Sequence, residues 1–147
     1  MLNDDTRILI LCTGNSCRSQ MAEGFARQFL IERELHNAAA AVRSAGVETH
    51  GLNPKAVKVM AEVGVDISGH KSTNLREYLN DRFDFVITVC DNAARNCPVF
   101  PGKGERLHWP FQDPASATGS EEEILGEFRK VRDQIKQQVG NWLLSIQ

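Results

Sequence analysis

A cysteine, an arginine and several small polar residues stand together near the start of the chain and could do chemistry on an anion. The segment reads Cys12-Thr13-Gly14-Asn15-Ser16-Cys17-Arg18-Ser19 and directly follows the apolar run of residues 8–11. Helical spacing begins at its end, so backbone N–H groups and the positive end of a helix should point at one spot. The planar guanidinium of Arg18 suits a tetrahedral oxyanion, and such a field favours the thiolate form of Cys12. The segment therefore predicts oxyanion binding beside a nucleophilic sulfur.

Strand and helix patterns alternate along the rest of the chain and must position this segment. Continuous apolar runs predict strands at residues 7–12 and 83–89, and weaker patterns predict strands at 40–47 and 105–109. Helical spacing covers residues 18–36, the stretch from Asn53-Pro54 to Gly64, and residues 120–146, with a brief helical turn at 75–79. Ser120 and Glu123 form a capping-box pair ahead of the last helix, whose apolar stripe is Ile124, Phe128, Val131, Ile135, Val139, Trp142 and Ile146.

This alternation predicts an α/β fold of three layers, in which a four-stranded parallel sheet carries helices on both faces. With 147 residues and 41% hydrophobic content, the chain has the size of one domain, residues 1–147. In such sheets a ligand binds beyond the carboxyl ends of the strands.

Two cysteines end predicted strands and should therefore lie on the same rim of the sheet. Cys12 ends the first strand and Cys90 ends the strand at residues 83–89. If these strands are neighbours, roughly 4.8 Å apart, the two sulfurs come within disulfide reach after a modest loop movement.

A third cysteine, Cys97, follows Cys90 by seven residues. If the intervening segment is helical, the two Cα atoms lie about 10 Å apart, whereas a disulfide tolerates about 7 Å. Bonding Cys90 to Cys97 would then unwind the segment, which would couple its conformation to its redox state.

Charge and composition exclude several classes of protein. The 17 basic and 19 acidic residues give a net charge of −2, without the basic excess typical of nucleic-acid binding. Asp4 and Asp5 stand where a signal peptide would carry positive charge, and no apolar run is long enough to span a membrane. We therefore expect a cytoplasmic protein, in which the four cysteines are reactive or buried rather than paired permanently. Nothing demands more than a monomer.

The chain resembles the thioredoxin-coupled arsenate reductases, which share the fold of the low-molecular-weight protein tyrosine phosphatases. The similarity runs over nearly the whole length. It rests on residues 12–24 (CTGNSCRSQMAEG), 44–51 (SAGVETHG), 53–56 (NPKA), 88–90 (TVC), 96–98 (NCP) and 108–115 (HWPFQDPA).

The resemblance implies a relay of three cysteines. Cys12 would attack arsenate held by the loop Thr13, Gly14, Asn15, Ser16, Cys17, Arg18 and Ser19, where phosphate or sulfate would compete. Arg18 would clamp the oxygens, Asp113 would protonate the leaving water, and Ser19 would stabilise the Cys12 thiolate. Cys90 would then release arsenite and form a Cys12–Cys90 disulfide. Attack by Cys97 would give a Cys90–Cys97 disulfide for thioredoxin to reduce.

Some members of this family bind a potassium ion near the loop, through residues that correspond to Asn15, Glu23, Ser44, Lys71 and Thr73. A lysine among the ligands argues against the cation, so we expect no metal and no organic cofactor. The hypothesis is that the Lys71 ammonium replaces the ion, pairs with Glu23 and orients Asn15.

Two other functions fit parts of the sequence. A phosphatase would use the same loop and Asp113, but residues 113–116 lack the tyrosines with which phosphatase relatives grip an aromatic ring, and Cys90 and Cys97 would be idle. Weak phosphatase activity is still expected. A zinc module with all four cysteines ranks last because the spacing of Cys90 and Cys97 suits a zinc site poorly. Cys17 is expected to pack beneath the loop without a role in the relay, and the four histidines lack metal spacing.

Overall fold

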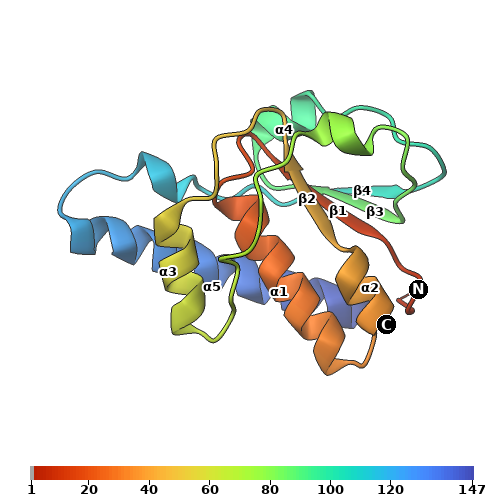
Figure 1. Cartoon of the computed structure of the whole chain (residues 1–147), viewed down its shortest axis with the longest axis horizontal. Coiled ribbons are helices and arrows are strands. Elements are labelled where there is room, and N and C mark those ends of the chain that lie inside the picture. The colour runs from red at the N-terminus through yellow and green to blue at the C-terminus, as the bar shows by residue number, and fades with distance from the viewer. Residues whose placement is uncertain (1) are drawn as a thin grey trace.

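Residues 2–147 are described by a computed structural model in which four parallel strands form one sheet (Figure 1). The strands are β1 (Ile8–Cys12), β2 (Arg43–Gly46), β3 (Phe85–Thr88) and β4 (Glu105–His108), in the order β2-β1-β3-β4. The chain adds β2 on one side of β1 and then crosses to add β3 on the other. The point where a parallel sheet changes direction in this way opens a crevice at the carboxyl ends of the strands. Here that crevice lies at the ends of β1 and β3.

Helices flank the sheet on both faces, which confirms the predicted three layers. They are α1 (Arg18–Glu32), α2 (His36–Ala41), α3 (Pro54–Glu62), α4 (Asp91–Arg95) and α5 (Glu121–Ser145), with 3₁₀ turns η1 (Leu75–Tyr78) and η2 (Pro114–Ser116). Figure 1 shows α1, α3 and α5 on one side of the sheet and the short α4 and η1 on the other.

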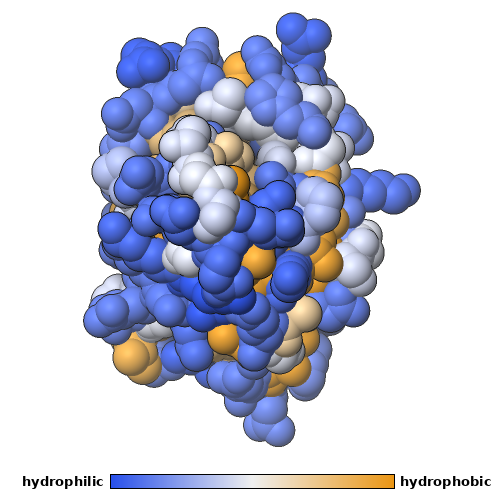
Figure 2. All heavy atoms as spheres, turned by 90° about the vertical axis from the view of Figure 1, so that its left-hand side faces the viewer, coloured by the Kyte–Doolittle hydropathy of each residue, from blue (hydrophilic) through white to orange (hydrophobic). Residues whose placement is uncertain are grey.

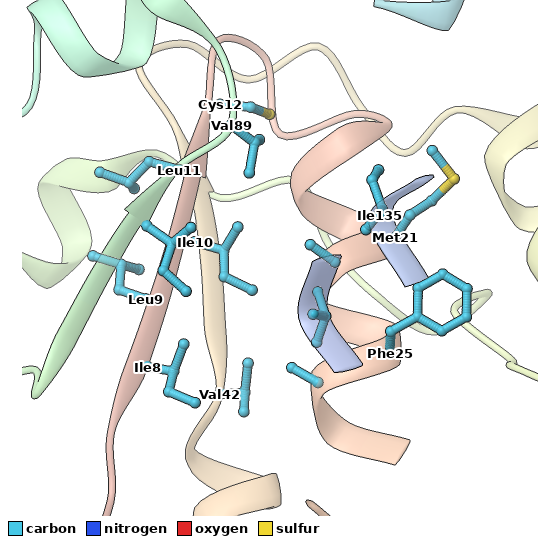
Figure 3. Close-up of a cluster of buried hydrophobic side chains, with 14 of the residues drawn as sticks. Ile8, Leu9, Ile10, Leu11, Cys12, Met21, Phe25, Val42, Val89 and Ile135 are labelled. Carbon is cyan, nitrogen blue, oxygen red and sulfur yellow. The ribbon is translucent and has the colours of Figure 1, made fainter. Parts of the chain in front are cut away.

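The core lies between β1 and the long helices (Figure 3). All five residues of β1 are buried, as a central parallel strand requires. Met21 and Phe25 of α1 and Ile135 of α5 pack in the same cluster, each at most 1% exposed. Cys12 stands at the end of β1 at the edge of this cluster, so the core anchors the strand that carries it.

The first helix is shorter than predicted. It ends at Glu32, because Glu34 adopts a φ of +61° and the chain turns back. The N–H groups of Glu34 and Leu35 donate to the carbonyls of Ile31 and Leu30, which is the Schellman pattern of helix ends. Glycine is the usual residue at such a position. Because Glu34 stands there instead, the sequence carries no clear signal for the end of α1. The separate helix α2 occupies the last residue of the predicted helix, residues 37–39, for which the sequence predicts no element, and the first two residues of the strand predicted at 40–47.

The other helix signals are confirmed. Asn53 caps α3 through the N–H of Lys55, and the capping box of Ser120 and Glu123 opens α5. Within the stripe predicted for α5, five residues are buried and the two terminal ones, Ile124 and Ile146, are half-buried at the edge of the core.

Hydrophilic residues predominate on the face shown in Figure 2, with apolar residues scattered among them. Within residues 2–147, no helix has the combination of length and hydropathy needed to cross a membrane.

Candidate active site

The segment that follows β1 folds into a tight loop around the sulfur of Cys12. Cys12 is 3% exposed, and its Sγ lies 2.8 Å from Ser19 Oγ and 3.2 Å from the backbone N of Asn15. A hydroxyl and an N–H placed in this way stabilise a thiolate, which is the nucleophilic form of a cysteine. The predicted contact between Ser19 and Cys12 is present.

Asn15 is the residue around which this loop is built. It is completely buried and adopts a φ of +50°, which asparagine tolerates better than most residues. Its side-chain amide donates to Ser19 Oγ at 2.8 Å and to Ser44 Oγ at 2.9 Å. Its Oδ1 accepts from the backbone N–H of Thr73 at 2.8 Å and from Gln20 Nε2 at 3.1 Å. Every hydrogen-bonding site of the amide is used, so Asn15 fixes the position of Ser19.

A second segment of backbone holds the loop from the outside. The N–H groups of Val47, Glu48, His50 and Asn53 donate to the carbonyls of Cys12, Thr13, Gly14 and Ser16, respectively. Gly46 begins this segment, where a Cβ would collide with the carbonyl of Glu48 and lie 2.7 Å from that of Thr13. The Ser-Ala-Gly motif at the end of β2 therefore contributes the outer support of the loop.

The loop leaves a small cleft with free donors. Cys12, Thr13, Gly14, Ser16, Cys17 and Arg18 line a cavity of about 160 Å³ together with His50, Asp113 and Ala115. The N–H groups of Ser16, Cys17 and Arg18 have no acceptor within residues 2–147. Drug-sized ligands occupy about 300 Å³ or more, so this cleft suits a small anion at the start of α1.

Arg18 and Asp113 meet at the mouth of the cleft. Arg18 Nη2 lies 3.7 Å from Asp113 Oδ2, and Nη1 donates to the carbonyl of Phe111 at 3.1 Å. The Asp113 side chain is 43% exposed, whereas that of Arg18 is 12% exposed. The structure thus places a fixed cation and a solvent-accessible carboxyl group beside the cleft, where sequence analysis expected an oxyanion clamp and an acid.

Cys17 is buried beneath the loop, as expected. Burial raises the pKa of its thiol to about 12, so Cys17 is protonated at neutral pH. A protonated thiol is a poor nucleophile.

Cys90 lies beside the loop, two residues after the end of β3. Strands β1 and β3 pair directly, with Leu11 opposite Thr88, which confirms that the strands before Cys12 and Cys90 are neighbours. Thr13 Oγ1 lies 3.3 Å from Cys90 Sγ and accepts from Asn92 Nδ2 at 3.1 Å. The Thr13 hydroxyl therefore links the anion loop to the second cysteine.

The segment between Cys90 and Cys97 contains the short helix α4. Cys90 caps α4, where its Sγ accepts from the N–H of Ala93 at 3.4 Å. Cys97 follows the helix, is half-buried and is a free thiol, as are the other three cysteines. Burial raises the pKa of the Cys97 thiol, and Arg106 partly offsets this. With α4 formed, the two cysteines sit at opposite ends of a helical segment.

The predicted pairing of Lys71 with Glu23 is wrong. Lys71 is exposed and makes no ion pair within residues 2–147. The buried Glu23 carboxylate instead lies 2.7 Å from Arg27 Nη2 and accepts from Ser44 Oγ at 2.5 Å. The pair with Arg27 spans four residues of one helix, which is a favourable geometry.

The residues that correspond to potassium ligands in the family make contacts within the chain. A guanidinium already contacts the carboxylate that would be a ligand, and the Asn15 oxygen is occupied by two N–H donors. Within residues 2–147, no group of three or more His, Cys, Asp or Glu side chains is arranged to hold a metal.

Two polar side chains, Gln20 and Ser72, support the loop without having been predicted, and His70 contacts Gln20. Gln20 Nε2 donates to the Asn15 carbonyl at 3.1 Å and to the Lys71 carbonyl at 3.0 Å, and its Oε1 lies 3.0 Å from His70 Nδ1. Ser72 Oγ donates to the Gly14 carbonyl at 2.9 Å. A buried glutamine in the first turn of α1 was the one available signal. Residues 70–73 lie about fifty positions away in the chain, so no local pattern could reveal them.

Comparison with known proteins confirms the resemblance to arsenate reductases with the fold of low-molecular-weight phosphatases. Residues 7–147 match the family model described as low molecular weight phosphotyrosine protein phosphatase. The chain belongs to this family. Within it, the chain is 51% identical over 128 residues to an arsenate reductase of Bacillus subtilis, covering 87% of this chain and 88% of that protein. It is 48% identical over 132 residues to one of Halalkalibacterium halodurans, covering 90% and 91%.

Solved structures show the same relationship. The fold matches an arsenate reductase in the phosphate-binding state with a TM-score of 0.73 and 33% identity, covering 97% of this chain and 99% of that one.

Proposed function

We propose that this protein reduces arsenate to arsenite with Cys12, Cys90 and Cys97 as successive thiol donors. One observation carries the proposal: a second cysteine, Cys90, follows the strand next to β1 and is joined to the Cys12 loop by the contact between Thr13 Oγ1 and Cys90 Sγ. The arsenate reductases that resemble the chain over most of its length support the same chemistry.

The first step forms a bond between sulfur and arsenic. Arsenate binds in the cleft through the free N–H groups of the loop and the Arg18 guanidinium. The Cys12 thiolate attacks arsenic, an arsenic–oxygen bond breaks, and the oxygen leaves as water after Asp113 donates a proton. Arsenic remains in its oxidised state in this adduct.

The second step is the reduction. The Cys90 thiolate attacks the Cys12 sulfur, and the electron pair of the sulfur–arsenic bond stays with arsenic, which leaves as arsenite. Two thiols have then been oxidised to a Cys12–Cys90 disulfide, and arsenic has gained two electrons. Thr13 Oγ1 and the N–H of Ala93 both contact the Cys90 sulfur and hold it beside the Cys12 loop.

The third step transfers the disulfide toward the surface. Cys97 attacks Cys90, Cys12 leaves as a thiolate, and a Cys90–Cys97 disulfide forms. The separation of the two cysteines across α4 requires this helix to unwind. We propose thioredoxin as the reductant, because a disulfide in an unwound surface segment is open to attack by another protein. The reaction needs one chain only, and a cytoplasmic location would supply the reductant.

Steady-state arsenate turnover tests this function. With thioredoxin, thioredoxin reductase and NADPH, the wild-type protein should consume NADPH on addition of arsenate, and glutathione with glutaredoxin should support less activity. Cys97→Ser should abolish multiple turnover. Cys17→Ser is the matched control and should retain activity, since Cys17 is buried and protonated. Full steady-state activity of Cys97→Ser would contradict the relay.

A second activity follows from the same cleft. Phosphate has the charge and shape of arsenate, and the Cys12 loop with Asp113 is also suited to phosphoryl transfer. We expect slow hydrolysis of an aryl phosphate that depends on Cys12 and not on Cys90 or Cys97. Failure to detect any hydrolysis at high protein concentration would contradict it.

A further inference from the structure

His108, at the end of β4, joins two elements that flank Cys90. Its Nδ1 lies 2.8 Å from Thr88 Oγ1 at the end of β3, and its Nε2 lies 3.0 Å from Asp91 Oδ1 in the first turn of α4. Thr88 is 6% exposed, which makes the first contact part of the rigid sheet. Asp91 is 73% exposed at its side chain and belongs to the segment that the proposed relay must unwind. His108 therefore holds a movable segment against a fixed one.

Helix α4 depends on such contacts. It has only five residues, and isolated helices of this length are unstable in water. Its internal support consists of backbone hydrogen bonds such as Asn96 N–H to the Asn92 carbonyl, a side-chain bond from Asn96 to Asn92, and the Cys90 cap. The contact between His108 and Asp91 ties its first residue to β4.

A disulfide between Cys90 and Cys97 removes this arrangement. Cys90 must leave its position as the helix cap, and Asp91 is bonded directly to it in the chain. Any contact that exists with α4 formed and is lost when it unwinds favours the dithiol over the disulfide. The contact between His108 and Asp91 is present while α4 is formed. Because Asp91 is next to Cys90 in the chain, unwinding of α4 should break this contact.

We propose that His108 is a positioning residue for the relay, which acts through Asp91 to stabilise the helical, reduced form of the segment between Cys90 and Cys97. The contact makes the Cys90–Cys97 disulfide easier to reduce, and so assists the return of the protein to its reduced state. This inference rests on the proposed relay. It adds a residue that lies outside the oxyanion loop and is separate from the three cysteines.

A purely structural role for His108 makes a different prediction. If His108 only stabilised the sheet, its loss would lower the stability of both redox forms equally. The equilibrium between dithiol and disulfide would then be unchanged. The reduction potential of the Cys90–Cys97 pair therefore distinguishes the two roles.

The test measures this potential in the full chain carrying Cys12→Ser, which prevents the competing Cys12–Cys90 disulfide. The protein is equilibrated in dithiothreitol buffers of defined ratio, the free thiols are alkylated, and the disulfide is quantified by mass spectrometry. His108→Asn keeps a group near Thr88 and loses the reach to Asp91, and it should shift the equilibrium about fivefold toward the disulfide, since charged surface hydrogen bonds have about this strength. A tenfold shift would correspond to about 30 mV.

Two variants and a control sharpen the result. His108→Gln can still donate to Asp91 and should restore most of the wild-type potential. Asp91→Asn, at an exposed position that folding tolerates, should shift the potential in the same direction as His108→Asn, and combining the two should add little because both remove one contact. Glu105→Gln, also exposed on β4, should leave the potential unchanged.

The outcomes separate the two proposals. Equal potentials in the parent protein, His108→Asn and Asp91→Asn, with the disulfide forming normally, would overturn the role of His108 and leave the relay intact. If no Cys90–Cys97 disulfide forms in the parent protein under oxidising conditions, the relay itself is contradicted, and the role of His108 with it.

Discussion

Thr13 Oγ1 lies 3.3 Å from Cys90 Sγ, although the two residues are 77 positions apart in the chain. Thr13 belongs to the loop that surrounds Cys12, and Cys90 follows the paired strand β3. The contact joins the Cys12 loop to Cys90, a residue that a phosphatase reaction would not use. In the proposed relay, this contact links oxyanion binding to thiol transfer.

Replacing Thr13 with valine should impair the second step more than the first. The change keeps the shape of the side chain and removes the hydroxyl that contacts Cys90 and accepts from Asn92. Release of arsenite in a single turnover should slow about tenfold, from the loss of a hydrogen bond to a charged group. Aryl phosphate hydrolysis should fall less, and Thr118→Val on the exposed surface should change neither rate. Equal losses in both assays would contradict a specific link to Cys90.

Removing the Asn15 amide should destabilise the loop. Asn15→Ala removes the hydrogen-bond partner of the buried Ser44 hydroxyl and of the half-buried Thr73 N–H, and places alanine at positive φ. The free energy of unfolding should fall by about 2 kcal/mol or more, as measured by urea denaturation. Asn141→Ala, at an exposed position in α5, should fall within about 0.5 kcal/mol of the wild type. A small effect at Asn15 would show that the network is not essential to the fold.

Potassium should not activate the protein. Arg27 supplies the positive charge beside the buried Glu23, so activity and melting temperature should be the same in potassium, sodium and choline chloride at equal ionic strength. Arg27→Gln removes this charge and should lower the melting temperature by several degrees. A rise in wild-type activity that is specific to potassium would contradict this assignment.

Attack by Cys97 should speed up as the pH rises. Burial raises the pKa of the Cys97 thiol, so the protonated form dominates near neutral pH and each increase in pH produces more thiolate. Below that pKa the rate of forming the Cys90–Cys97 disulfide should increase about tenfold per pH unit, as followed by acid quenching and mass spectrometry. Arg106→Gln should slow this step, because Arg106 lowers the pKa of Cys97, and Arg76→Gln should not. A flat pH profile would indicate that unwinding of α4 limits the rate.

Local patterns predicted the parts of the site that are continuous in the chain. The apolar run before Cys12, the polar loop and the helix after it form one unit. Because Cys12 and Cys90 each end a predicted buried strand, the two cysteines were expected at the same edge of the sheet. The expectation that Cys12 and Cys90 lie close together was conditional on the two strands being neighbours, and the pairing of β1 with β3 meets that condition.

The missed features depend on distant residues or on an unusual choice of residue. Glu34 ends α1 where glycine is typical, so the boundary had no visible signal. Lys71 was assigned to Glu23 from its place in the family motif, although Arg27, four residues along the same helix, was the closer partner. That spacing was readable in the sequence. The support from Ser72 required the tertiary structure.

The most direct measurement is a single turnover of Cys97→Ser with arsenate, followed by alkylation, proteolysis and mass spectrometry. The proposed relay predicts about one arsenite released per protein chain, together with a disulfide between Cys12 and Cys90. Cys17 should be recovered as a free thiol. Arsenite release without this disulfide, or a disulfide that contains Cys17, would contradict the account.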